Sequence, residues 1–170
     1  MTDMPVSAAI GLGGNLGDAP AILLQGLERL AHTPDITLVR HSRLYRTAPI
    51  GPPGQPDYAN AAALVETRLA PEDLLDLLQG IEQELGRVRD VRWGARTLDL
   101  DLLLYGSQVI NTSRLSVPHR EMHTRAFVLV PLAEIAADRH IPGQGMVGSL
   151  AAALAQDGIA PWPDSRWPTA

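Results

Sequence analysis

Residues 92–106 read Arg92-Trp93-Gly94-Ala95-Arg96-Thr97-Leu98-Asp99-Leu100-Asp101-Leu102-Leu103-Leu104-Tyr105-Gly106. Polar and apolar residues alternate from 97 to 102, which predicts a strand that enters a core from an arginine-rich loop. Side chains on a strand alternate between faces, so Asp99 and Asp101 share one face, roughly 7 Å apart. Paired carboxylates repel unless cations lie beside them, and Mg²⁺ prefers such oxygens together with water and phosphates. The alternative is a half-exposed strand whose polar face contacts only solvent.

The composition predicts one domain. The chain has 170 residues, 45% of them hydrophobic, which is enough for one core and too few for two. We expect this domain over 1–160 and a loosely held tail over 161–170. No apolar run reaches membrane-spanning length and the first residues lack a secretory signal pattern, so we expect a cytoplasmic protein without a membrane partner. The absence of cysteine excludes disulfides, thiolate zinc sites and a cysteine nucleophile.

The charge is negative overall but unevenly distributed. A net charge of -5 argues against a surface committed to nucleic acid. Lysine is absent, which excludes a phosphate-loop lysine and a Schiff-base lysine. Between 87 and 125 the chain carries seven arginines (87, 89, 92, 96, 114, 120, 125) against four acids (90, 99, 101, 121). Arginine suits bidentate phosphate contacts, so this region predicts an anion site.

The order of the expected elements indicates the fold class. Strands are expected over 7–12, 36–46, 58–67 and 97–102, and helices over 19–31 and 70–85. Short strands at 109–110 and 115–117, a helical region over 122–137 interrupted at Pro131, and a helix over 147–156 follow. Strand, helix, strand, strand, helix, strand is the split βαβ order of a ferredoxin-like sheet. We therefore predict an α+β, ferredoxin-like fold, with helices packed on a mainly antiparallel sheet.

The first strand ends in a glycine-rich turn, residues 11–18. This turn is not a dinucleotide fingerprint, because Leu16 occupies the place of the third glycine. We expect its glycines to permit a tight turn and close approach of the backbone.

Four strings give the chain a family resemblance. They are Tyr45-Arg46-Thr47 to Pro49; Gln55-Pro56-Asp57-Tyr58 with Asn60-Ala61; Gly86-Arg87 through Arg92-Trp93-Gly94 to Asp101; and Val117-Pro118-His119 with Arg125-Ala126-Phe127. With them the chain resembles the 6-hydroxymethyl-7,8-dihydropterin pyrophosphokinase family of folate biosynthesis. The resemblance runs from the glycine turn to about 131–132. It implies transfer of the ATP β,γ-diphosphate to the hydroxymethyl oxygen of the dihydropterin, with release of AMP.

The resemblance also implies the site residues. Asp99 and Asp101 are the expected ligands of two Mg²⁺ ions, and Arg87 and Arg96 join them as catalytic residues that hold the polyphosphate. The expected ATP contacts are Gln79, Glu82, Arg87, Arg89, Arg92, Trp93, Arg96, Leu102, Arg114, Ser116, His119 and Arg125. For Gln79 a solvated helix face, and for His119 a structural surface histidine, remain open alternatives.

The expected pterin site follows from the same resemblance. A flat, amide-rich bicycle calls for aromatic faces and hydrogen-bonding edges. Tyr58 and Phe127 are expected to lie on the two faces of the pterin, and Asn60 is expected to hydrogen-bond to its edge. The full set of expected pterin contacts is Thr47, Ala48, Ile50, Tyr58, Asn60, Asp99 and Phe127. The chain departs from the family's usual residues at Ala48, Ala95 and Arg120. We expect these differences to change the affinity for the substrates more than the chemical step.

Two other functional classes remain open on the sequence. A palm-type nucleotidyltransferase also places paired aspartates on a ferredoxin-like sheet, but it releases pyrophosphate in place of AMP. A small-molecule or RNA-binding module of the same fold would need no paired acids, and an RNA binder should carry exposed strand aromatics. We expect a monomer whose partners are ATP and the dihydropterin.

Overall fold

The fold is organised around one antiparallel sheet. The computed structural model describes residues 1–48, 54–86, 98–154, 156 and 158–169. The six strands of the sheet are β1 (Val6–Gly14), β2 (Ile36–His41), β3 (Tyr45–Thr47), β4 (Tyr58–Thr67), β5 (Asp99–Tyr105) and β10 (Ile159–Pro161). Their order is β10-β3-β4-β1-β5, with β2 also paired to β4. The sequence prediction of an α+β, ferredoxin-like fold is confirmed.

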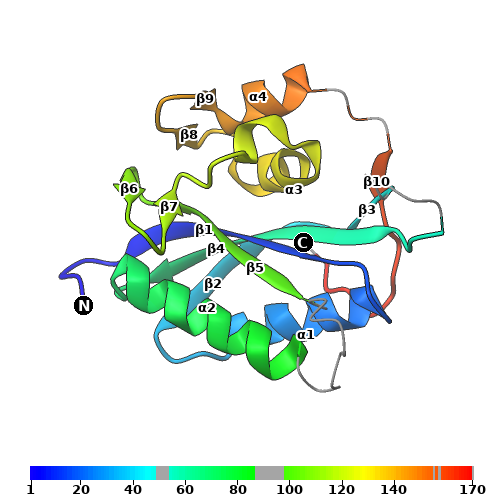
Figure 1. Ribbon diagram of the computed structural model, residues 1–170, viewed down its shortest axis with the longest axis horizontal. Coiled ribbons are helices and arrows are strands. Elements are labelled where there is room, and N and C mark those ends of the chain that lie inside the picture. The colour runs from blue at the N-terminus through cyan, green and yellow to red at the C-terminus, as the bar shows by residue number, and fades with distance from the viewer. Residues whose placement is uncertain (49–53, 87–97, 155, 157, 170) are drawn as a thin grey trace.

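Helices cover both faces of the sheet. Helices α1 (Ala19–Ala31) and α2 (Pro71–Gly86) lie on one face of the sheet, and α3 (Ala126–Ala136) lies on the other, with α4 (Val147–Ala153) packed on its outer side (Figure 1). Each layer has its own buried hydrophobic cluster. Smaller elements complete the described chain: β6 (Ile110–Asn111), β7 (Ser116–Val117), η1 (Met122–Thr124), β8 (His140–Ile141) and β9 (Gly145–Met146). The sheet is therefore the middle of three layers.

Asp99 begins the edge strand β5. The sequence predicted this strand over 97–102, and the described strand continues to Tyr105. Residues 87–97, and with them the predicted start of the strand, lie outside the described residues. Among the described strands of the sheet, β5 pairs with β1 alone, so its other side forms the sheet edge. This edge position leaves the start of β5 accessible from both layers.

The single strand predicted over 36–46 is two strands in the structure. At the break, the Ser42 N–H donates to the Ala62 carbonyl (2.8 Å) and the Ser42 Oγ accepts from the Ala62 N–H (2.9 Å). A side-chain oxygen thus replaces a backbone carbonyl in the ladder. The chain takes four steps over 41–45 against three over 60–63 on β4, so one extra residue shifts the register. The predicted alternation of faces therefore does not continue through residue 42.

Helix α3 differs from the prediction of a break at Pro131. Pro131 lies inside a continuous helix and is buried with Leu129 and Leu132. A proline has no N–H, so the helical hydrogen bond to the carbonyl of Phe127, four residues earlier, cannot form. Burial of the apolar residues on both sides of Pro131 favours a continuous helix over a break.

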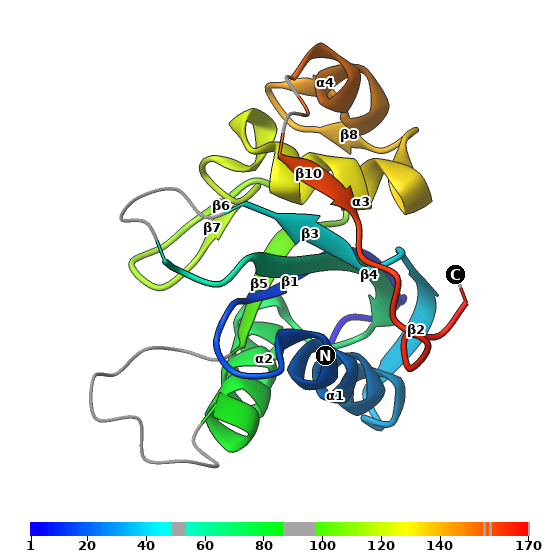
Figure 2. The same ribbon diagram turned by 90° about the vertical axis from the view of Figure 1, so that its right-hand side faces the viewer.

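The segment after α4 returns to the sheet. Strand β10 lies beside β3 (Figure 2). Beyond it, the Trp162 N–H donates to the Leu44 carbonyl (2.8 Å) and the Trp167 Nε1–H donates to the Ser42 carbonyl (3.0 Å). The Arg166 guanidinium contacts Asp18 at the N-cap of α1 (2.8 Å). The described residues 162–167 thus contact the β2–β3 region and the start of α1. Within the described ranges, no helix has the length and hydropathy needed to cross a bilayer.

Candidate active site

Strand β5 presents its two carboxylates on one face. Asp99 pairs with Gly13 and Asp101 with Gly11 across the β1–β5 ladder. Asp99 is half-buried and Asp101 is exposed, whereas Leu100 between them is buried in the cluster under α1 and α2. The glycines opposite the acids keep the space above β1 open. Asp99 and Asp101 line the same cavity, as the alternation predicted.

This first cavity, of about 470 Å³, lies over the ends of β1, β3 and β4 and the start of α3. Every described residue that the resemblance assigned to the pterin lines it: Thr47, Ala48, Tyr58, Asn60, Asp99 and Phe127. Ile50, the remaining member of that set, lies outside the described residues. The structure thus brings together residues from β3, β4, β5 and α3.

Polar and aromatic groups in the first cavity are held by their neighbours. The Asn60 Nδ2 donates to the Thr47 Oγ1 (2.8 Å), and Asn60 is only 6% exposed. Tyr58 is 38% exposed and free to present its ring to the cavity. The Arg125 Cζ lies 5.7 Å from the centroid of the Phe127 ring. The cavity therefore has one fixed amide, two aromatic rings and one cation on its walls.

A second cavity, of about 410 Å³, lies beside the edge of β5. The described residues that the resemblance assigned to ATP, with one exception, line it: Gln79, Glu82, Leu102, Arg114, Ser116 and His119. The exception is Arg125, which lines the first cavity. Asp101 lines both cavities. Its carboxylate therefore stands at the junction of the two sites.

Glu82 has a structural contact inside the second cavity. Its Oε2 accepts a hydrogen bond from the Leu100 N–H (2.7 Å), between the two aspartates. That N–H points away from β1, where an edge strand has no further strand to pair with. Glu82 thus holds the start of β5 against α2. Gln79, one turn earlier, is exposed on the same cavity.

His119 has a buried polar atom in the second cavity. Its backbone N–H donates to the Leu103 carbonyl (3.0 Å), which fixes the residue beside β5. Its Nδ1 is buried and has no hydrogen-bond partner among the described residues. Buried polar atoms are nearly always paired, so this nitrogen needs a partner that the described residues do not supply.

Two of the described arginines at the cavities, Arg114 and Arg125, are paired with acids, whereas Arg120 in the second cavity donates to the Ser116 hydroxyl (3.3 Å). Arg114 forms an ion pair with Asp76, and this hydrogen bond raises the pKa of the guanidinium. Arg125 forms an ion pair with Glu121 four residues earlier. Both pairs are exposed and therefore exchange partners at little cost. Five further predicted ATP contacts lie outside the described residues: Arg87, Arg89, Arg92, Trp93 and Arg96.

The carboxylates fit a magnesium site that is completed by a substrate. In the described part of the chain, no three or more His, Cys, Asp or Glu side chains are grouped so as to hold a metal ion. Asp99 and Asp101 supply hard oxygen ligands on an open cavity wall. Mg²⁺ is commonly bound by one or two carboxylates plus water and substrate phosphates, so this donor set suits it.

Sequence reasoning missed several lining residues. Apolar positions such as Leu103 and Val128 line the first cavity, and Leu75 and Leu115 line the second. These residues carry no local signal, because an apolar residue in a cavity wall has the same pattern as one in the core. The glycine-rich turn, in contrast, did carry a local sequence signal. A Cβ at Gly13 would lie 3.2 Å from Asn60 Oδ1, which is the close approach expected there.

The residues of both cavities fall within a region that matches a known family. The family model described as 7,8-dihydro-6-hydroxymethylpterin-pyrophosphokinase (HPPK) matches residues 9–137, well over half of the chain. The chain belongs to the HPPK family. The resemblance inferred from the sequence motifs is thereby confirmed.

Curated relatives agree with this assignment. A 2-amino-4-hydroxy-6-hydroxymethyldihydropteridine pyrophosphokinase of Haemophilus influenzae is 48% identical over 145 residues, covering 85% of this chain and 91% of its own. The enzyme of the same name from Pseudomonas aeruginosa is 47% identical over 150 residues, covering 88% and 93%. These HPPK relatives match nearly their whole length.

Solved structures agree at the level of the fold. A Plasmodium falciparum HPPK-DHPS triple mutant has a TM-score of 0.69 at 14% identity, covering 87% of this chain. Another HPPK-DHPS, crystallised in complex with substrates, has a TM-score of 0.69 at 13% identity, covering 88%. This chain spans less than half the length of those solved chains (44% and 43%). At such identities the likeness establishes the HPPK fold alone.

Proposed function

We propose that the protein transfers the β,γ-diphosphate of ATP to the hydroxymethyl oxygen of 6-hydroxymethyl-7,8-dihydropterin, a step of folate biosynthesis. Membership of the HPPK family and the named relatives support this reaction. The observation that carries it is that Asp101 lines both cavities. A two-substrate transfer needs two binding sites that meet where the reacting atoms lie, and Asp101 marks that meeting point.

The first cavity is the proposed pterin site. A pterin ring is flat and carries amide-like hydrogen-bonding edges, so it requires aromatic faces and a fixed polar partner. Tyr58 and Phe127 supply the rings, and Asn60, held by Thr47, supplies an amide whose oxygen can accept from the pterin edge. Ala48 and Ile50 complete the proposed contacts. With Asp99 beside it, this site would hold the hydroxymethyl group near the carboxylates.

The second cavity is the proposed ATP site. Arg114 lies on its wall and can exchange the exposed Asp76 carboxylate for a phosphate. His119, which lines the same cavity, is a further proposed contact of the nucleotide. Gln79, Glu82, Leu102 and Ser116 form the remaining wall. Arg125, Arg87, Arg89, Arg92, Trp93 and Arg96 are proposed contacts that would close on the polyphosphate.

The chemistry follows from this placement. The hydroxymethyl oxygen attacks the β-phosphorus of ATP, the bond between that phosphorus and the α–β bridging oxygen breaks, and AMP leaves with the bridging oxygen. The hydroxyl proton passes to solvent or to a phosphate oxygen. Phosphoryl-type transfer depends on in-line positioning and charge neutralisation more than on a strong base. The arginines and the site walls therefore serve to bind and orient the triphosphate.

Asp99 and Asp101 are the proposed Mg²⁺ ligands, and we propose two ions. When bound, Mg²⁺ neutralises phosphate oxygens and polarises the phosphorus for attack. Two carboxylates on the wall of one open cavity support this, because Mg²⁺ prefers carboxylate oxygens together with water and substrate phosphates. The ion count is tested by measuring the initial rate against free Mg²⁺ at saturating Mg-ATP. A rate that rises with a second binding constant indicates two ions, and a rate already saturated indicates one.

One assay tests the reaction. The protein is incubated with ATP, MgCl₂ and 6-hydroxymethyl-7,8-dihydropterin, and the nucleotide product is identified by chromatography. We expect AMP in equal amount to the pterin diphosphate. ADP would indicate single phosphoryl transfer, and pyrophosphate release would indicate a nucleotidyltransferase. Absence of any nucleotide product, with binding retained, would indicate a ligand-binding module.

We also propose that the protein acts as a monomer in the cytoplasm. Residues of a single chain supply both the proposed pterin site and the proposed ATP site, which supports this proposal. Sedimentation equilibrium with and without both substrates tests this, with a mass of about one chain as the expected result. The cytoplasm is proposed because it supplies the ATP that the reaction consumes.

A further inference from the structure

Strand β3 carries one wall of the first cavity and is held on two sides. On its inner side it pairs with β4, where Thr47 lies opposite Tyr58. On its outer side it pairs with β10, and the Ala48 N–H donates to the Gly158 carbonyl (3.0 Å) (Figure 2). The C-terminal segment therefore supplies backbone partners for the residues that end β3. Thr47 and Ala48 both line the cavity.

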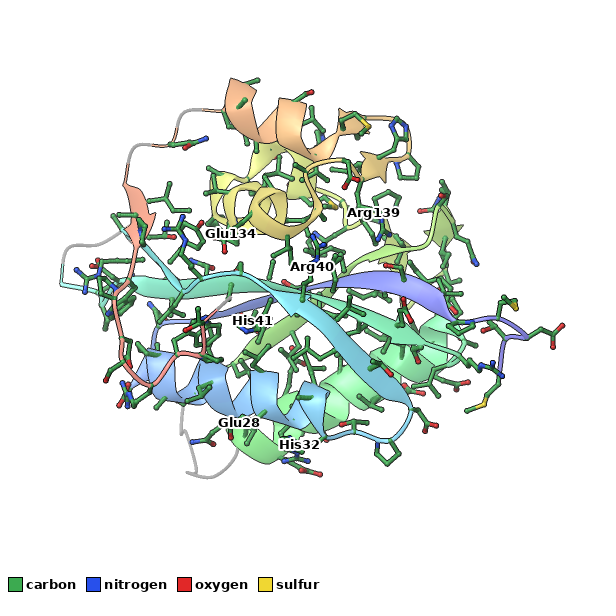
Figure 3. The ribbon with its side chains drawn as sticks, turned by 180° about the vertical axis from the view of Figure 1, so that it is seen from behind. Glu28, His32, Arg40, His41, Glu134 and Arg139 are labelled. Atoms are coloured by element: carbon green, nitrogen blue, oxygen red, sulfur yellow. The ribbon has the colours of Figure 1, made fainter. Side chains whose placement is uncertain are left out.

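The two faces of β3 are tied to different elements. Tyr45 donates its hydroxyl proton to Glu134 on α3, which lies above the sheet (Figure 3). Arg46, the next residue, lies on the opposite face of the strand. Its guanidinium carbon stacks 4.4 Å from the centroid of the Trp162 ring, just beyond β10. Consecutive residues of β3 thus connect it to α3 and to the C-terminal segment.

Arg46 also reaches the segment that precedes Tyr58. Its Nε lies 3.5 Å from Asp57 Oδ2. Asp57 is bonded directly to Tyr58, so a fixed Asp57 restricts the backbone from which the Tyr58 ring projects. Among the described residues, a long hydrogen bond also reaches this segment, from Asn15 Nδ2 to the Pro56 carbonyl (3.4 Å). Trp162, Arg46 and Asp57 therefore form a continuous link from the C-terminal segment to the cavity.

We propose that Trp162 is a positioning residue for the first cavity, because it holds Arg46 against Asp57 and thereby fixes the backbone that carries Tyr58. The inference rests on the proposed function in one respect: the pterin is taken as the ligand that Tyr58 contacts. Arg46 and Asp57 are both half-exposed, with 50% and 41% of their side chains accessible. An exposed ion pair alone holds its partners weakly, and stacking on an aromatic ring restricts the arginine to one orientation.

The chain offers a matched control in Trp167. It lies on the same segment, is half-buried like Trp162 and packs against the same hydrophobic cluster. Its contacts lead elsewhere, to the Ser42 carbonyl and to the His41 ring at 6.1 Å between centroids. Neither Ser42 nor His41 lines either cavity. Loss of Trp167 therefore removes a similar packing surface without touching the link to Tyr58.

The test compares Trp162→Ala, Trp162→Phe and Trp167→Ala in the full chain. Hydrogen exchange of the amides of residues 55–60 is measured first, because it requires no ligand. We expect faster exchange there in Trp162→Ala alone. Steady-state kinetics then give KM for each substrate and kcat. We expect KM for the pterin to rise about threefold to tenfold in Trp162→Ala, with KM for ATP and kcat nearly unchanged, and recovery in Trp162→Phe.

The outcomes separate the inference from the proposed function. Equal exchange at 55–60 in Trp162→Ala and wild type overturns the inference, whatever the substrate is. A similar rise in pterin KM for Trp162→Ala and Trp167→Ala also overturns it, because that result indicates a general loss of packing. A wild-type protein that makes no AMP overturns the proposed function, while the exchange result still decides the role of Trp162.

Discussion

Gly13 and Asn60 lie opposite each other on β1 and β4, and the Asn60 side chain occupies space that a Cβ at residue 13 would need. The distance from that Cβ to Asn60 Oδ1 would be 3.2 Å, closer than ordinary van der Waals contact. The wall of the first cavity therefore depends on a glycine in β1.

We predict that Gly13→Ala weakens pterin binding. The new methyl group would displace the Asn60 amide by a few tenths of an ångström and lengthen its 2.8 Å hydrogen bond to Thr47. We expect KM for the pterin to rise about threefold to tenfold, with KM for ATP unchanged. Gly80→Ala is the control, because nothing lies within 4 Å of its added Cβ. An unchanged pterin KM in Gly13→Ala would show that Asn60 does not contact the substrate.

Asp101 should matter for turnover and little for folding. Its side chain is exposed and stands between the cavities, so Asp101→Asn removes charge without leaving a void. We expect kcat to fall about 10²-fold or more, the usual loss when a group that stabilises developing charge is removed. Asp99→Ala should also abolish turnover. Thermal unfolding is measured alongside, with Tm for Asp101→Asn expected within about 2 °C of wild type. AMP formation at the wild-type rate by either variant would contradict the assignment of these carboxylates.

Glu82 should contribute to the stability of the fold. Glu82→Ala removes the acceptor for the Leu100 N–H at the sheet edge. We expect a loss of about 1 kcal/mol in the free energy of unfolding, measured by urea denaturation. Gln79→Ala, on the same cavity but exposed, is the matched control and should leave that free energy within about 0.5 kcal/mol. Equal stability of the two variants would mean that solvent replaces Glu82 without cost.

The contacts of Arg166 should make stability depend on pH in the acid range. Hydrogen bonds from Arg166 lower the pKa of the Asp164 carboxyl to about 2, and they also lower the pKa of Asp18. A carboxyl whose folded pKa lies below its unfolded value, about 3.9, stabilises the fold above that value and loses this contribution as pH falls through the folded pKa.

We therefore expect wild type to be more stable than Arg166→Ala near pH 6, with the difference shrinking between about pH 4 and pH 2. The Arg166 and Asp18 side chains are exposed and that of Asp164 is 13% exposed, so we expect a modest difference that decreases in high salt. Thermal unfolding at stepped pH measures it. If the stability difference between wild type and Arg166→Ala is as large at pH 2 as at pH 6, the effect comes from packing of the arginine side chain and not from its ion pairs.

Local sequence patterns were sufficient to predict most of the helices and strands. The helices expected over 19–31 and 70–85 and the strand over 58–67 agree with α1, α2 and β4 within one residue at each end. The same-face placement of Asp99 and Asp101 follows from the two-residue period of a strand. These features depend on residues that are close in sequence, which is why a single sequence predicts them.

The features that sequence reasoning missed depend on distant partners. The break at Ser42 requires Ala62, and the contacts of the C-terminal segment require Leu44, Ser42 and Asp18. No local pattern at 161–170 predicts these partners. Every residue has a backbone carbonyl, so the sequence does not indicate which carbonyl will accept a given hydrogen bond. The roles assigned to individual cavity residues came from the family motifs, since neither composition nor period distinguishes a ligand contact from a core position.

The short strand β10 has a consequence for how the protein behaves in concentrated solution. It occupies the outer hydrogen-bonding side of β3, which would otherwise be an open template for strands of other molecules. Variants that detach this strand should therefore form intermolecular β-structure and precipitate before their helices melt, and light scattering would register the damage earlier than circular dichroism.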